Sequence, residues 1–221
     1  MKLENIGLAV LLVLSSFTIS ADIIEEVTGL QKTWAKVNYT MVGDAQEEKF
    51  EELVKQADEV IAEYPNAAEG FIWRGIIKSS FAGAKGGLGA MSLAKASKSD
   101  LEQAIVLNGE ALAGSAFTSL GTLYFKVPGW PIGFGDDVKA KEFLEKALTI
   151  NPDGIDSNYF YASFLSEDEQ YSEAEKHLLK AQNAAPRPER ELADKGRHDE
   201  INKLLSVVVN EQKQKTSTSL F

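Results

Sequence analysis

Carboxylates are abundant in this chain, but the spacing of its residues places no nucleophile beside a base. The two histidines, His177 and His198, fall on different expected helices, so each is interpreted as a helix-surface residue. There is no cysteine, which excludes thiolate catalysis, disulfides and attachment of a lipid through a thiol. The adjacent carboxylates Asp136 and Asp137 could serve a hydrolase, but at a helix start such residues are typical of caps. We therefore expect no enzyme.

Two short segments resemble ligand loops without having the residues that a ligand needs. The segment AKGGLGAMS resembles a phosphate-binding glycine loop, but Ala90 and Met91 stand where Lys and Ser or Thr would face the phosphates. The segment NPDGIDSN resembles a calcium loop, but it lacks the Asp-x-Asp-x-Asp-Gly order. We interpret it as a turn in which Asp156 caps the next helix. No cofactor and no metal are expected.

The chain is acidic, with a formal net charge of −10, so its surface repels nucleic acid and anionic lipid. Its one concentration of basic residues is PRPERELADKGRH, residues 186–198, which contains Arg187, Arg190, Lys195 and Arg197. Acids are interleaved with these bases, so we interpret the segment as the solvated start of a helix rather than a phosphate site. The composition excludes nucleic acid as a partner.

The segment KVPGWPIGFGDD, residues 126–137, is the best candidate for a binding surface. Its two prolines stop a helix and its three glycines allow tight turns, while Trp130 and Phe134 must pack somewhere. Two interpretations stay open. Trp130, Pro131 and Phe134 fold back and seal their own hairpin, or they line a groove for a peptide or a small apolar ligand. We expect mixed behaviour, with Phe134 packed under the loop and Trp130 partly buried against the neighbouring insertion.

The elements that would position these residues are helices. Apolar residues recur at helical spacing along the chain, and no alternating strand pattern of useful length competes with them. The fold class is therefore predicted to be all-α. Three of the clearest apolar stripes are Phe50, Leu53, Val54, Ala57, Val60 and Ile61; Ala140, Phe143, Leu144, Ala147 and Leu148; and Ile201, Leu204, Leu205 and Val208.

Residues 117–152 contain an ordered pattern of bulky and small residues. The pattern is Phe117-x2-Leu120-Gly121-x2-Tyr124, then Ala140-x3-Leu144-x2-Ala147, then Pro152. Gly121 and Ala140 would let two helix axes approach closely, while the aromatic residues fill the space between successive helix pairs. The pattern resembles the tetratricopeptide repeat, which implies a solenoid of antiparallel helical hairpins.

Four hairpins and a final capping helix are expected from this resemblance. A proline marks the end of three repeats, at Pro65, Pro152 and Pro186, and Gly109 stands in its place at the end of the second repeat. Residues 199–212 form a lone amphipathic stripe, as expected of a helix that caps the last hairpin. The predicted solenoid spans residues 22–212, and a disordered tail is predicted for residues 213–221.

Extra residues are predicted near 82–91 and 126–137, at the turns within the second and third hairpins. Equivalent turns of neighbouring repeats lie side by side, so the two insertions are expected to form one composite surface. Candidate residues for binding a partner or ligand there are Trp73, Leu88, Tyr124, Trp130, Pro131 and Phe134.

The resemblance implies a binding or scaffold module that recognises a protein or peptide, and it implies no reaction. The alternative is a periplasmic solute-binding component of a transport system, with a small-ligand pocket under the two glycine-rich insertions. A closed apolar cavity there would favour the small ligand, whereas an open concave groove would favour an extended peptide.

Residues 1–21 are predicted to be a secretory signal peptide. A basic residue, Lys2, precedes an apolar run over residues 6–19. The small residues Ser20 and Ala21 follow the run, which is shorter than the ~20 residues that cross a bilayer. We therefore expect a periplasmic or secreted protein that meets the membrane only through the uncleaved signal.

Export with cleavage gives the first test. The intact mass of the exported protein should match a chain that starts near Asp22, because signal peptides are cut after small residues. Recovery of the full-length chain in the membrane fraction would contradict this expectation.

Overall fold

The computed structural model describes residues 5–218 of the chain, with side chains described from 22 to 215 except at 88. Over this range the chain forms nine helices, which confirms the all-α prediction. Their bounds are α1 (Asn5–Thr40), α2 (Gly43–Glu63), α3 (Ala68–Lys85), α4 (Gly87–Asn108), α5 (Ala111–Lys126), α6 (Asp137–Ile150), α7 (Ile155–Glu167), α8 (Tyr171–Gln182) and α9 (Glu191–Thr218).

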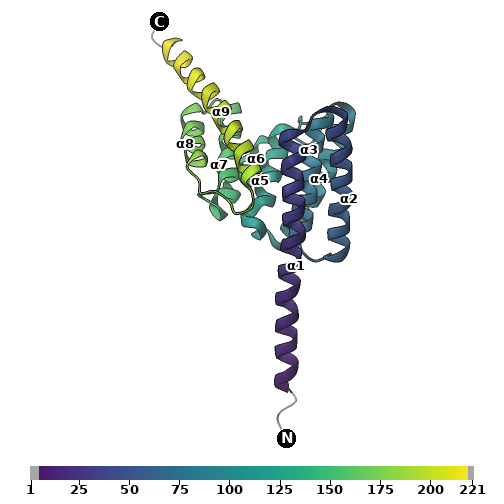
Figure 1. The fold of residues 1–221 in the computed structure, drawn as a ribbon. Helices are drawn as coiled ribbons and strands as arrows, with labels where there is room; N and C mark the ends of the chain where they lie inside the picture. The colour runs from purple at the N-terminus through teal and green to yellow at the C-terminus, as the bar shows by residue number, and fades with distance from the viewer. Residues whose placement is uncertain (1–4, 219–221) are drawn as a thin grey trace.

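The helices pair into consecutive hairpins that stack on one another (Figure 1). α1 pairs with α2, α3 with α4, α5 with α6 and α7 with α8. The first helices of the hairpins, α1, α3, α5 and α7, contact one another in that order and form one inner row. α9 packs on α8 and α7 and covers the last hairpin. The structure is therefore the expected tetratricopeptide-like solenoid with a C-terminal capping helix.

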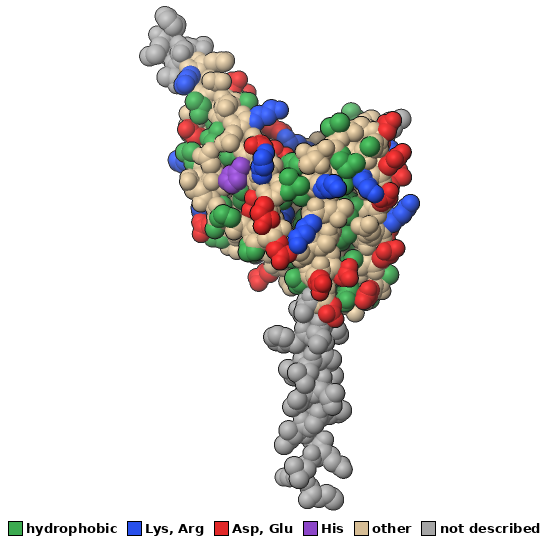
Figure 2. Space-filling view, viewed as in Figure 1, with side chains coloured by type: hydrophobic (Ala, Val, Ile, Leu, Met, Phe, Trp, Pro, Cys, Tyr) green, Lys and Arg blue, Asp and Glu red, His purple; other side chains and the backbone are tan. Residues whose placement is uncertain are grey.

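α2 shows how the sequence pattern determines which face of a helix is buried. Phe50, Leu53, Ala57 and Val60 recur at helical spacing and are all buried. The rest of α2 is rich in Asp and Glu, and acidic side chains line the edge of the molecule that this helix forms (Figure 2). The acidic charge of the chain is thus partly concentrated along one outer edge.

Small residues allow the two helices of a hairpin to approach closely, as the repeat pattern predicts. A Cβ added at Gly121 would lie 2.7 Å from Leu144 Cγ and 3.1 Å from the Ala140 carbonyl oxygen. In the preceding hairpin, a Cβ at Gly75 would lie 2.8 Å from Leu101 Cγ. Neither position has room for a side chain, so these glycines set the distance between helix axes.

The turn of the second hairpin differs from the prediction, because the insertion near residues 82–91 is not a loop. α3 continues to Lys85 and α4 begins at Gly87, so the extra residues lengthen both helices. The connection is the single residue Gly86, and the φ angles of Gly86 and Gly87 are 62° and 57°. These left-handed values favour glycine, which explains how so short a turn reverses the chain.

The turn of the third hairpin is the long loop that the sequence predicts. α5 ends at Lys126 and α6 begins at Asp137. Asp136 caps α6, because its carboxylate accepts a hydrogen bond of 3.1 Å from the backbone N–H of Lys139. The expected cap is confirmed, and it anchors the loop where α6 starts.

The C-terminal helix is longer than its periodic stripe over residues 199–212, because it begins at Glu191. It also returns to the first helix of the chain. A Cβ added at Gly196 would lie 2.4 Å from the ring of Tyr39, so this glycine lets α9 approach α1 closely. Burial raises the pKa of Tyr39 to about 12. The first and last helices of the array are therefore in contact.

Two predicted segments extend beyond the residues that the structure describes. Residues 1–4 of the predicted signal peptide and 219–221 of the predicted tail lie outside them. Within the described part of the chain, no helix is both long and apolar enough to cross a bilayer.

Replacing Ala140 by Leu should destabilise the third hairpin. Ala140 is fully buried beside Gly121, so the added carbons should overpack the contact and lower the free energy of unfolding by about 1–3 kcal/mol. Urea unfolding measures this. Val138→Leu, at an exposed position of the same helix, is the control and should change the free energy by less than about 0.5 kcal/mol. An Ala140→Leu chain as stable as the control would show that this repeat is wrongly assigned.

Candidate functional site

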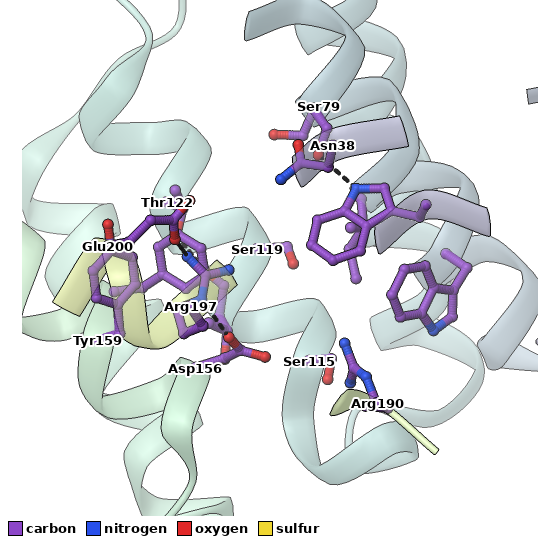
Figure 3. A pocket seen from close by; sticks show the side chains of 16 residues that line it. Asn38, Ser79, Ser115, Ser119, Thr122, Asp156, Tyr159, Arg190, Arg197 and Glu200 are labelled. Atoms are coloured by element: carbon purple, nitrogen blue, oxygen red, sulfur yellow. Dashed lines mark hydrogen bonds and ion pairs between the residues drawn. The ribbon is translucent and has the colours of Figure 1, made fainter. Parts of the chain in front are cut away.

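A pocket of about 260 Å³, named here the central pocket, lies between the inner row of helices and α9 (Figure 3). Hydroxyl and amide groups, aromatic rings and charged side chains all contribute to its wall. Its polar lining is Asn38, Ser79, Ser80, Ser115, Thr118, Ser119 and Thr122, its apolar lining is Trp34, Trp73, Ile76, Tyr159 and Phe160, and its charged lining is Asp156, Arg190, Arg197 and Glu200.

Asp156, in the first turn of α7, connects that helix to two arginines from the C-terminal segment. Its Oδ1 lies 2.8 Å from Arg197 Nε, and its Oδ2 forms an ion pair with the Arg187 guanidinium. Burial opposes ionisation of this carboxyl group, but the two arginines outweigh burial and hold the pKa of Asp156 well below its ordinary value. Arg187 is itself held by Asp194, 2.6 Å from its Nε. These pairs fix α9 against α7.

Arg197 lies at the centre of this cluster and is only 7% exposed. Besides Asp156, its guanidinium pairs with Glu200 one turn further along α9. It also lies over the rings of Tyr159 and Phe160, 4.5 and 4.4 Å from their centroids. Two acids and two rings therefore satisfy this arginine within the protein.

Arg190 is held differently from its two neighbours. Its guanidinium carbon lies 5.5 Å from the centroid of the Trp73 ring, and its Nε is buried without a hydrogen bond among the described residues. Burial lowers the pKa of Arg190, and the nearby Arg187 lowers it further. Trp73 packs edge-to-face on Trp34, whose Nε1 donates a 2.9 Å hydrogen bond to Ser80 Oγ. The two tryptophans thus contact Arg190 or each other, but they do not neutralise the charge of its guanidinium.

The backbone just before the pocket-lining hydroxyl residues of α5 has an unusual conformation. Leu112, Ala113 and Gly114 all have left-handed φ angles, of 48°, 54° and 73°. Such values are unfavourable for leucine and alanine, and strained residues of this kind concentrate at functional sites. The turn delivers Ser115 to the pocket wall, where its hydroxyl donates a 2.6 Å hydrogen bond to the Leu112 carbonyl.

A second cavity of about 600 Å³, named here the apolar cavity, lies between the second hairpin's turn and the third hairpin's loop. A Cβ added at Gly133 in the loop would lie 3.0 Å from Met91 Cε of α4, so the two insertions are neighbours, as predicted. The cavity is partly open to solvent, and it shares Ser79 and Thr122 with the central pocket. Its other lining residues are Ala82, Gly83, Gly87, Ala90, Met91, Ala94, Leu123, Lys126, Val127, Pro128 and Ile132.

The loop shows only half of the behaviour expected of it. Phe134 is half-buried and packs edge-to-face on Tyr124, with ring centroids 5.7 Å apart. The expected partial burial of Trp130 is wrong, because its side chain is 88% exposed. The loop closes on itself instead: the Gly135 N–H donates to the Pro128 carbonyl at 3.0 Å. Trp130, at the tip of the closed loop, is left exposed to solvent.

The predicted binding residues do not form one site. Trp73 is buried in the wall of the central pocket, whereas Tyr124 is a core residue that lines neither cavity. Trp130 and Pro131 are exposed at the tip of the loop. The backbone of Leu88 lies in α4, and its side chain is outside the described set.

Two sequence interpretations of charged residues are wrong. The basic segment 186–198 is not simply a solvated helix start, because Arg187, Arg190 and Arg197 turn inward and only Lys195 among its four named bases is exposed. Asp156 does not cap α7, since Gly154 is in the N-cap position and the carboxylate is engaged by arginines. Asp156 and its two arginines are too far apart in sequence for a local pattern to show that they pair.

His177 is half-buried at the surface of α8, and it joins two helices. Its Nδ1 lies 2.9 Å from Asn158 Oδ1, and its ring packs edge-to-face on Tyr161. The Asn158 amide nitrogen donates to the Pro152 and Gly154 carbonyls, so its oxygen is the acceptor for histidine. Burial lowers the pKa of His177. Among the described residues, no group of three His, Asp or Glu side chains could hold a metal ion.

Comparisons with known proteins do not identify a family. No family model and no curated protein match the chain. The crystal structure of MamA is similar at a TM-score of 0.45 and 18% sequence identity, over 81% of this chain and 99% of the MamA chain. At that score and identity, the similarity supports no inference about activity or partners.

Asp156→Asn should lower the free energy of unfolding by about 3 kcal/mol, because it leaves Arg187 and Arg197 without their shared acid. Asp153→Asn, which breaks only the exposed pair with Lys180, is the control and should cost less than about 1 kcal/mol. Urea unfolding of both variants measures the difference.

The pH dependence of stability gives a second readout of Asp156. Because its folded-state pKa is depressed, its ion pairs stabilise the protein above the ordinary aspartate pKa of about 4, and that stability is lost as the pH falls further. We therefore compare the two chains between about pH 5 and pH 3, a range of about one unit on either side of that pKa. Over this range the free energy of unfolding should fall more for the wild-type chain than for Asp156→Asn. Parallel curves would contradict the assignment.

Proposed function

We propose that this chain is an exported, non-catalytic binding module that holds a protein partner through the loop of its third hairpin. The observation that carries the proposal is a pair of exposed apolar side chains on the loop: Ile132, which lines the apolar cavity, is 72% exposed, and Trp130, two residues before it, is 88% exposed. Tryptophan next to a pocket is typical of the few residues that dominate interface energies. Export rests on the predicted signal in residues 1–21.

The partner that fits this surface is a peptide segment with a bulky apolar side chain. Small and apolar residues line most of the apolar cavity, so an apolar side chain can enter without leaving polar groups unpaired. Trp130 would cover the same segment from the loop tip. The chain has a net charge of −10, so a partner with basic residues beside its apolar anchor would associate faster.

The alternative, a solute-binding component of a transport system, has no support in the comparisons. The cavity under the two insertions is apolar, as that alternative requires, but it is partly open to solvent. The exposed apolar side chains of Trp130 and Ile132 on the same loop favour the protein partner.

Trp130→Ala should weaken partner binding by about 30-fold, or ~2 kcal/mol, while barely changing the free energy of unfolding. The partner is first identified in an envelope extract with a photoreactive cross-linker at Ile132. Its affinity for purified wild-type and variant chains is then measured by calorimetry.

Two further variants make this comparison specific. Val106→Ala removes another exposed apolar side chain, on α4 and outside the cavity lining, and should leave the affinity unchanged. Phe134→Ala should lower the free energy of unfolding, because Phe134 packs on Tyr124 under the loop. Equal affinities of the Trp130→Ala and Val106→Ala chains would refute the proposed surface.

A further inference from the structure

The central pocket contains one guanidinium group that no acid of the described chain pairs with. The carboxylates of Asp156, Asp194 and Glu200 all pair with the other two arginines of the cluster. Arg190 makes no ion pair among the described residues, and its Nε is buried without a hydrogen bond. Arg190 is partly buried, and Asp156 and Asp194 act on it only from beyond ion-pair distance, so an anion in the pocket could pair with it directly.

Uncharged polar groups face the same space without partners in the described part of the chain. Asn38, Ser79 and Ser119 line the pocket, and their side chains make no hydrogen bond with other described residues. Ser119 points into the pocket from α5, and Ser115 lies on the Arg190 side of it (Figure 3). The pocket therefore offers hydrogen bonds to a ligand in addition to the guanidinium of Arg190.

The position of Arg190 suits recognition of a planar carboxylate. The guanidinium carbon of Arg190 lies 5.5 Å from the centroid of the Trp73 ring, within the range of a cation–π contact. A planar guanidinium presents its N–H groups in a rigid fork that matches the two oxygens of a carboxylate. A lysine at this position would supply charge without that geometry.

We propose that the central pocket binds a small organic carboxylate, with its carboxylate on Arg190 and the polar groups of its skeleton on Ser119, Ser79 and Asn38. The volume of about 260 Å³ suits a small molecule and not a folded peptide or a lipid. A monoanion fits better than a phosphate dianion, because the carboxylates of Asp156 and Glu200 are nearby and repel added negative charge. This site goes beyond the protein-binding loop and lies in a different cavity.

Calorimetric titration of the full chain tests the proposal with defined probes. D-glucuronate is compared with D-glucose, and 3-hydroxybutyrate with butane-1,3-diol, so that each carboxylate has a neutral analogue. Inorganic phosphate is the third probe. The variants are Arg190→Gln and, as the control that removes one exposed positive charge outside the pocket, Lys95→Gln.

At least one carboxylate should bind, and its neutral analogue should bind at least about tenfold more weakly. Arg190→Gln should weaken carboxylate binding at least about tenfold, and Lys95→Gln should not. Absence of binding by both carboxylates, equal binding of a neutral analogue, tighter binding of phosphate, or unchanged binding by Arg190→Gln would each overturn the proposal.

Two additional variants keep the result interpretable. If Arg190→Gln does not fold, Ser119→Ala replaces it, and binding weakened at least about threefold supports the site, whereas unchanged binding overturns it. Trp130→Ala should bind the carboxylate as the wild-type chain does, because Trp130 lines neither cavity. The proposed carboxylate site and the proposed protein-binding loop can therefore be refuted independently of each other.

Discussion

The inner surface of this protein depends on one carboxylate, Asp156, held between Arg187 and Arg197. The acid belongs to α7, while the arginines belong to α9 and to the segment that leads into it. Their attraction holds α9 against the inner row of helices. Arg190, directly before α9, is thereby placed in the wall of the central pocket. Partial burial makes these charges costly unless they pair, so the packing of α9 on α7 and the pairing of these charges support each other.

Two cavities of different chemistry follow one another along the groove between α3 and α5. Ser79 and Thr122 line both and mark the boundary between them. Towards α9 the groove has hydroxyl groups, aromatic rings and charges, whereas towards the loop it has mainly small and apolar residues. One pair of neighbouring helices thus lines both a polar cavity and an apolar cavity.

The hairpins could be predicted from the sequence because the contacts that form them are close in sequence. Gly121 and Ala140 make their contact within one repeat, and the pattern that contains them is visible in the sequence. The arginine cluster could not be predicted, since Asp156 is 31 and 41 positions from the arginines and only the return of α9 unites them. Exposure of Trp130 depends on hydrogen bonds within the loop, which composition does not specify.

The contact between Gly196 and Tyr39 changes how the helical array comes apart. In an open solenoid each repeat touches only its neighbours, so the terminal hairpins can fray while the middle persists. Here the first and last helices also touch, so opening either terminus removes contacts from the other. The linear array becomes a closed ring of contacts, so we expect its two ends to unfold in one cooperative transition.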